Sequence, residues 1–195
     1  MRRNSIRAVL AVGLSFVLVG IWSAPLLAAE ESEILQERYR IREVGQDSLA
    51  ALYEIQPSAR YVIENAAGYG VFSTFGVKIF FAGGGTGKGF VHNNRTKRYT
   101  YMRMVQVQGG LGFGASKDRV IWVFETQKAL TDFVSSGWDF GAKAQAAAMV
   151  QDTGGMFSGA ISVAPGVYIY RLTETGLAAE LTVSGTKYFK DPDLN

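Results

Sequence analysis

The glycine-rich run at residues 83–88 is the first place where residue types and spacing suggest chemistry. It reads Gly-Gly-Gly-Thr-Gly-Lys and looks like a phosphate loop. That motif needs a glycine five residues before the Gly-Lys pair and a Ser or Thr after it, to cradle phosphates and a bound cation. Those positions hold Ala82 and Gly89, and no G-x-G-x-x-G spacing occurs. The sequence therefore predicts no nucleotide binding.

The remaining polar residues form no recognisable catalytic or metal-binding set. His92 is the only histidine and sits beside an Asn-rich turn, which predicts a solvated loop residue. Ser184 and Lys187 form S-x-x-K, but Ser184 ends an alternating strand pattern, whereas that chemistry needs the serine at a helix start. Acidic residues occur singly, so no metal cage or glycosidase dyad is indicated. We expect a non-catalytic protein without cofactor or metal, and an unrecognised hydrolase whose residues meet only in space is the alternative.

The first 29 residues have the layout of a secretory signal peptide. Arg2, Arg3 and Arg7 precede an apolar run over residues 8–27, and small residues end the segment at Ala29. We expect cleavage there, with Pro25 preventing a helix across the cut. An uncleaved anchor is the alternative, since about 20 apolar residues span a bilayer. Either form would place the domain in the periplasm or outside the cell.

The apparent basic character of the chain belongs to that signal. All 17 acidic residues lie beyond Ala29, while three of the 20 Lys and Arg residues lie before it, so the remaining chain is balanced at 17 of each. Nucleic-acid binding normally rests on a net basic footprint, and we expect no nucleic-acid partner. The absence of cysteine excludes disulfides and zinc–thiolate sites.

Helical patterns open the domain. Apolar residues repeat along one broad side of 30–56, which predicts an amphipathic helix that Pro57 ends, followed by a helical turn over 58–66. Packing on a β core is the expected role of the first helix, and membrane-surface binding is the alternative because Arg38 and Arg42 flank its apolar stripe. Thr126 is expected to cap one further helix that ends near Ser136.

Strand patterns fill most of the rest. Short runs rich in Val, Phe, Tyr and Thr predict strands near 69–75, 78–92, 98–109, 111–116, 119–125, 138–149, 166–172 and 177–184. Asn93 to Lys97 should form a hairpin loop, because Asn tolerates left-handed backbone. The predicted fold is α+β: a curled antiparallel sheet or barrel-like sandwich of about seven or eight strands, with the N-terminal helix and one further helix packed on it. Residues 30–66 would be its helical part and 67–195 its glycine-rich β part.

Glycines in two of these strands fall on one face. Alternation along a strand places Gly83, Gly85, Gly87 and Gly89 together, and Gly110, Gly112 and Gly114 together. Bare backbone invites close approach. The structural interpretation is a strongly coiled sheet in which aromatic side chains from a second layer or a helix press onto the glycines. The functional interpretation is a groove lined by backbone, in which a ligand chain lies against the glycines.

Four segments resemble one known family. Residues 64–72 (ENAAGYGVF), the Gly83 to Gly89 run and residues 176–185 (GLAAELTVSG) are similar to the SYLF domain family, as is the strand and helix over 121–133. The resemblance covers roughly residues 55–192. It implies a lipid-binding module, with eukaryotic relatives that associate with phosphoinositides and actin, and with membrane contact through an N-terminal helix and basic residues. By position the counterparts would be Arg38 and Arg42, with Lys78 and Lys88 as head-group contacts.

The sequence thus predicts an exported domain that associates with phospholipid or a membrane surface at the cell envelope. Actin is not carried over, because an exported protein does not meet it. A structural module whose strand edges or glycine faces bind an envelope protein or a second copy is the alternative.

Overall fold

A computed structural model describes residues 24–79, 82–109, 114–140, 157–174, 176–177 and 185–195. The chain forms two compact units, Met1–Gln36 and Glu37–Asn195. The helices are α1 (Ala24–Ile55), α2 (Ser58–Asn65) and α3 (Gln127–Ser136), as predicted. However, α1 begins before residue 30 and runs through Ala29, with Pro25 in its first turn, where a proline leaves no hydrogen bond unmade. Within the described residues, no helix combines the length and apolarity needed to cross a bilayer.

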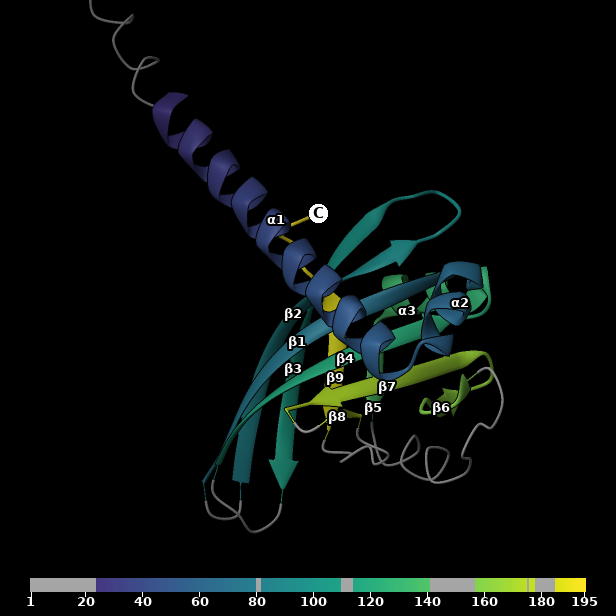
Figure 1. Cartoon of the computed structure of the whole chain (residues 1–195). Coiled ribbons are helices and arrows are strands. Elements are labelled where there is room, and N and C mark those ends of the chain that lie inside the picture. Colours follow the sequence, from purple (N-terminus) through teal and green to yellow (C-terminus); the bar gives the residue numbers. More distant parts are fainter. Residues whose placement is uncertain (1–23, 80–81, 110–113, 141–156, 175, 178–184) are drawn as a thin grey trace, which may run out of the picture. The chain divides into compact units, whose positions relative to one another are not determined.

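The β part is one antiparallel sheet, which confirms the predicted α+β class. Its described strands are β1 (Gly68–Ile79), β2 (Ala82–Asn93), β3 (Tyr99–Gly109), β4 (Gly114–Phe124), β5 (Trp138–Phe140), β6 (Ile161–Ala164), β7 (Val167–Thr173), β8 (Gly176–Leu177) and β9 (Thr186–Lys190). Their order is β5-β9-β3-β2-β1-β4-β7-β6, and β8 pairs with β7. The long strands β1 to β4 curl together through the centre of the sheet (Figure 1).

Several predicted strand limits were wrong. The predicted strands 111–116 and 119–125 are one strand where described, because Asp118 continues the alternation as a buried residue paired with Arg171. β1 likewise passes through Gly76 and Val77 without the expected break. The short strands β6 and β9 were missed. Of the predicted strands at 138–149 and 177–184, most positions lie outside the described residues.

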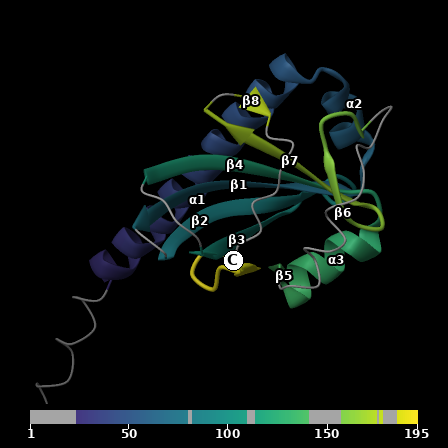
Figure 2. The same cartoon turned by 90° about the horizontal axis from the view of Figure 1, so that it is seen from below.

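Helices cover both faces of the sheet. Residues 37–55 of α1 and the short helix α2 lie on one face, and α3 lies on the other (Figure 2). Gly45 sets the distance on the α1 face, because a Cβ there would come within 2.3 Å of the Phe90 ring on β2. Glycine at this position therefore lets the helix backbone approach the sheet closely.

The face under α3 holds an aromatic core. Trp122, Phe133 and Tyr188 are buried, with ring centroids 4.7–5.6 Å apart. Phe72 packs edge-on against Tyr188 at 4.8 Å. Its ring also covers Gly89 on the neighbouring strand, where a Cβ would lie 2.6 Å from Phe72 Cδ1. The nearest atom to that Cβ position is the backbone oxygen of Val71, at 2.1 Å. The space at Gly89 is therefore filled by the neighbouring strand of the same sheet, and not by an aromatic side chain from a second layer or a helix.

The predicted hairpin loop joins β2 to β3, but asparagine does not take its left-handed position. Lys97 does, with φ of 58°. The side-chain oxygen of Asn93 instead accepts hydrogen bonds from the backbone N–H groups of Arg95 and Thr96, both at 3.0 Å. Asn93 thus shapes the turn with its side chain, and the strain falls on an exposed lysine. Thr126 caps α3 as predicted, accepting from Ala129 N–H.

Candidate functional site

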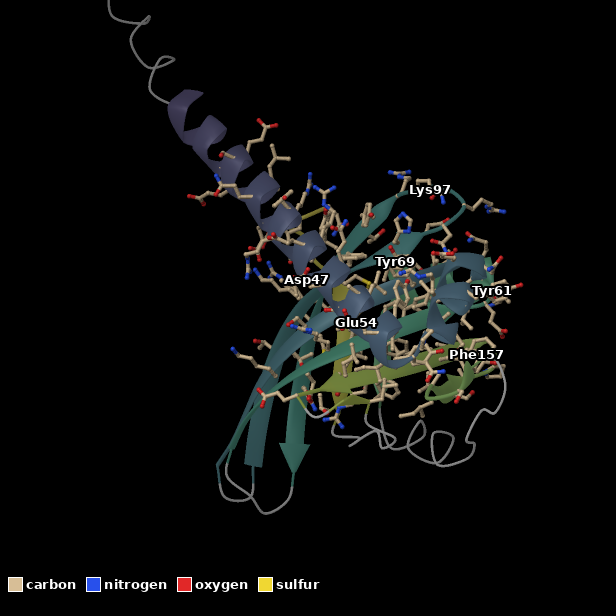
Figure 3. All side chains as sticks on the ribbon, viewed as in Figure 1. Asp47, Glu54, Tyr61, Tyr69, Lys97 and Phe157 are labelled. Atoms are coloured by element: carbon tan, nitrogen blue, oxygen red, sulfur yellow. The ribbon has the colours of Figure 1, made fainter. Side chains whose placement is uncertain are left out.

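Six basic residues gather where α1, the β2–β3 hairpin and the end of β9 meet. We call this the hairpin surface: Arg38, Arg42, Arg95, Lys97, Arg98 and Lys190, together with the half-exposed Tyr99. Figure 3 shows Lys97 at the outer end of the hairpin. None of these six cations makes an ion pair with another described residue. A neutral domain can therefore still present a local basic patch.

Arg38 and Arg42 lie over tyrosine rings on β3. The guanidinium carbon of Arg38 is 5.7 Å from the centroid of Tyr101, and that of Arg42 is 5.7 Å from the centroid of Tyr99. Arg38 also donates to the backbone carbonyl of Leu194 at 3.0 Å. These contacts fix the direction of both arginines, so the two predicted residues share one surface with the hairpin.

A cavity of about 560 Å³ opens into this surface. Its walls include Arg38, Arg98 and Lys190 with the rings of Tyr99 and Tyr101, and no Asp or Glu side chain is among the lining residues. Cationic side chains next to tyrosine rings suit the interface between a phospholipid head group and its acyl chain.

A second cavity, which we call the groove, lies between α1 and the sheet. It has a volume of about 730 Å³. Its charged lining residues are all basic: Arg40, Lys88, Arg103 and Lys117. Its apolar lining residues include Ile41, Val44, Val71, Val105 and Phe189. Apolar walls with a few charged groups are typical of ligand sites, and the volume lies in the usual range of ~300–1,000 Å³.

Acidic residues behind the groove neutralise part of this charge. Glu37 receives hydrogen bonds from Arg40 Nε and Nη2, both at 2.9 Å, and from Lys88 Nζ at 2.8 Å. The Arg40 hydrogen bonds, followed by those of Lys88, lower the pKa of Glu37 to about 2, so its carboxylate stays ionised. Arg103 pairs with the buried Asp191 at 2.7 Å and with Asp193. Lys117 makes no ion pair with any described residue.

The other residues predicted for the site are more scattered. Lys88 lines the groove, whereas Lys78 lies in β1 with its side chain outside the described residues. Gly83, Gly85 and Gly87 lie in β2 and Gly114 begins β4, while Gly110 and Gly112 are outside the described residues. A Cβ at Gly87 would meet the backbone oxygen of Ser73 at 2.8 Å. At Gly87 the strands approach too closely for a side chain.

His92 is not the solvated loop residue expected. It is the last residue but one of β2 and is half-buried, with its ring centroid 5.2 Å from that of Tyr69 and 4.6 Å from that of Tyr99. Its Nδ1 lies 3.1 Å from Asn94 Oδ1. Burial lowers the pKa of His92, so the ring is neutral at physiological pH. Its ring therefore packs against those of Tyr69 and Tyr99, and Tyr99 belongs to the hairpin surface.

Sequence reasoning missed most of the cations that the fold brings together. Three of the four residues from Arg95 to Arg98 are basic, and this signal was available in the sequence. It was interpreted only as part of a turn and as the first residue of a strand. Arg40, Arg103 and Lys117 carry no local signal, because their neighbourhood depends on strand register. Among the described residues, no three His, Asp or Glu side chains gather as a metal would require.

Comparison with known proteins gives a distant relationship. Beta cell expansion factor A of Aeromonas veronii is 29% identical over 161 residues, which cover 82% of this chain and 59% of that protein. The chain thus spans about three fifths of the length of this relative. No protein-family model matches the chain.

Proposed function

We propose that this protein is an exported, non-catalytic domain that associates with anionic phospholipid through the hairpin surface. The observation that carries the proposal is the gathering of six basic residues from three elements around Tyr99, with no ion pair to neutralise them among the described residues. Each Lys or Arg near an anionic membrane contributes ~1 kcal/mol. Three or four of them acting together would hold the protein at a membrane surface.

The sequence supports the same proposal independently. Resemblance to the SYLF family implies lipid binding, and the first 29 residues have the pattern of an export signal. An exported protein would find its phospholipid in the cell envelope. Because the chain beyond the signal has no net charge, attraction would come from local basic patches such as the hairpin surface and would fall off within ~10 Å at 0.1 M salt.

Flotation with liposomes tests this proposal. Residues 30–195 should float with vesicles that contain phosphatidylglycerol at low salt, and much less with phosphatidylcholine alone. Replacing two exposed cations, Arg95→Glu with Arg98→Glu, should lower partitioning to anionic vesicles at least ~30-fold, from about 1 kcal/mol for each lost charge.

A matched control reverses two positive charges outside the hairpin surface. Arg60 and Lys128 are exposed on α2 and α3, and each forms an ion pair with a residue one helical turn away. Arg60 also lies over the ring of Tyr53, at 4.4 Å from its centroid. Arg60→Glu with Lys128→Glu should leave flotation nearly unchanged. If no vesicle carries the protein at low salt, the proposal fails. A mass that rises with concentration, together with indifference to lipid, would favour the alternative of a protein-interaction module.

A further inference from the structure

A row of cations crosses four strands on the α1 face. Register pairs Arg103 of β3 with Lys88 of β2, Lys88 with Ser73 of β1, and Ser73 with Arg119 of β4. Directly paired residues in antiparallel strands share a face and lie ~5 Å apart. Three cations and a hydroxyl therefore form one continuous row across the α1 face, and Arg103, Lys88 and Ser73 of this row line the groove.

Like charges at paired positions destabilise a sheet unless something neutralises them. Glu37 does so for Lys88, and Asp191 and Asp193 do so for Arg103. Arg119 is exposed and has no ion pair with a described residue, and the same is true of Lys117, which lines the groove. This end of the row thus keeps positive charge without an ion-pair partner among the described residues, and it is complementary to an anion.

An apolar path leaves the row along β3. Val105 is two residues beyond Arg103 and Val107 two beyond Val105, so all three side chains share one face. Val105 is 40% exposed and Val107 is 68% exposed. Ile41 and Val44 of α1 line the same groove from above. A free inorganic anion would leave these apolar surfaces in water, and a neutral hydrocarbon would leave the cations without a partner.

We propose that the groove binds one molecule of an anionic lysophospholipid, with its phosphate at Lys117, Arg119 and Ser73 and its single acyl chain along the apolar path. A cavity of about 730 Å³ is the size of a site for one small ligand. Lysine and arginine form charge-assisted hydrogen bonds to phosphate oxygens. This ligand goes beyond association with a membrane surface, because it is held singly and by other residues than the hairpin surface.

Native mass spectrometry of the full chain tests the proposal. Lysophosphatidylglycerol, added below its micelle concentration, should bind as one molecule for each chain. Lysophosphatidylcholine with the same acyl chain should bind at least tenfold more weakly, because its head group has no net charge. Removing two methylene groups from the acyl chain should weaken binding about tenfold.

Two variants separate the head-group site from the chain site. Lys117→Gln with Arg119→Gln removes the two cations that lack ion pairs and should weaken lysophosphatidylglycerol at least tenfold. Thr86→Trp keeps every charge but fills the groove at an exposed lining position, and it should also abolish one-to-one binding. Circular dichroism of each variant should match that of the original chain, since both changes lie at exposed positions.

Arg95→Gln with Arg98→Gln provides the matched control, because it removes the same charge from the hairpin surface. It should leave lysophospholipid binding unchanged while weakening flotation with anionic vesicles. The groove proposal is overturned if the two lysophospholipids bind equally, if inorganic phosphate binds as tightly as the lipid, or if Lys117→Gln with Arg119→Gln has no effect. These outcomes are independent of flotation, so the groove and the hairpin surface can fail separately.

Discussion

The two faces of the sheet are built from the same strands and have opposite characters. Under α3, the rings of Trp122, Phe133 and Phe72 interlock and leave no exposed side chain among them. Under α1, close packing is found at Gly45 against Phe90, and farther along the sheet the groove opens among charged side chains. Both faces bury apolar side chains, among them Leu52, Phe90 and Ile121 on the α1 side, and the groove opens on the α1 side.

Strand alternation explains how one set of strands does both. On β3, Met102 and Met104 point into the aromatic core, while Arg103 and Val105 line the groove. On β2, Gly89 lies under the Phe72 ring, while the next residue on the other side, Lys88, reaches Glu37. Polar residues can therefore accumulate on the α1 face without weakening the core one residue away.

The largest expected effect on stability comes from removing an aromatic ring from the core under α3. Phe133 is 1% exposed and its ring contacts those of Trp122, Phe124 and Tyr188. Phe133→Ala should lower the free energy of unfolding by about 3–5 kcal/mol, since a buried aromatic leaves a cavity that the surroundings fill only in part. Urea denaturation followed by tryptophan fluorescence measures it. A loss below about 1 kcal/mol would mean that this face is not the main source of stability.

An intermediate effect is expected where α1 touches the sheet. Gly45→Ala should improve helix propensity by up to ~1 kcal/mol, but the new Cβ would lie 2.3 Å from the buried Phe90 ring. Overpacking of this kind costs about 1–3 kcal/mol, so the net effect should be destabilising. Gly185→Ala is the control, because nothing lies within 4 Å of its Cβ position. If Gly45→Ala stabilises the protein, the close approach of α1 is wrong.

Local signals predicted the elements well and the functional surfaces poorly. The period of apolar residues over 30–56, the cap at Thr126 and the turn at Asn93 all act over a few residues, and each is present in the structure. The missed strands β6 and β9 are short and lack a long alternating pattern. They exist because longer neighbours, β7 and β3, offer an edge to pair with.

The site could not be predicted in full because the sequence does not show the register in which the strands pair. Lys88 could be identified as a basic strand residue, but its neighbours Arg103 and Glu37 are far away in sequence. Arg38 and Arg42 were chosen because they flank the apolar stripe of the helix and because the family resemblance points to this helix. The structure places Arg38 in one cavity with Arg98, and Arg42 over the ring of Tyr99. Side chains that meet through strand pairing or helix docking leave no pattern in a single chain.

The smallest expected effect on stability comes from Glu37, whose carboxylate pairs with two cations that line the groove. Hydrogen bonds from Arg40 and Lys88 lower the pKa of Glu37 from 4.5 to about 2, so the ionised carboxylate stabilises the folded state. That contribution is present above pH 4.5 and is lost as the pH falls toward 2. Arg40 and Lys88 are largely exposed, so Glu37→Gln should cost only about 0.2–1 kcal/mol at pH 7.

Urea denaturation at pH 7 and pH 3 separates this contribution from the core. The original chain should lose more stability than Glu37→Gln over this interval, because only the original chain must protonate that carboxylate. Phe133→Ala should lose as much as the original chain, since an apolar cavity does not titrate. If Glu37→Gln and the original chain respond equally to pH, Glu37 contributes nothing through its ion pairs.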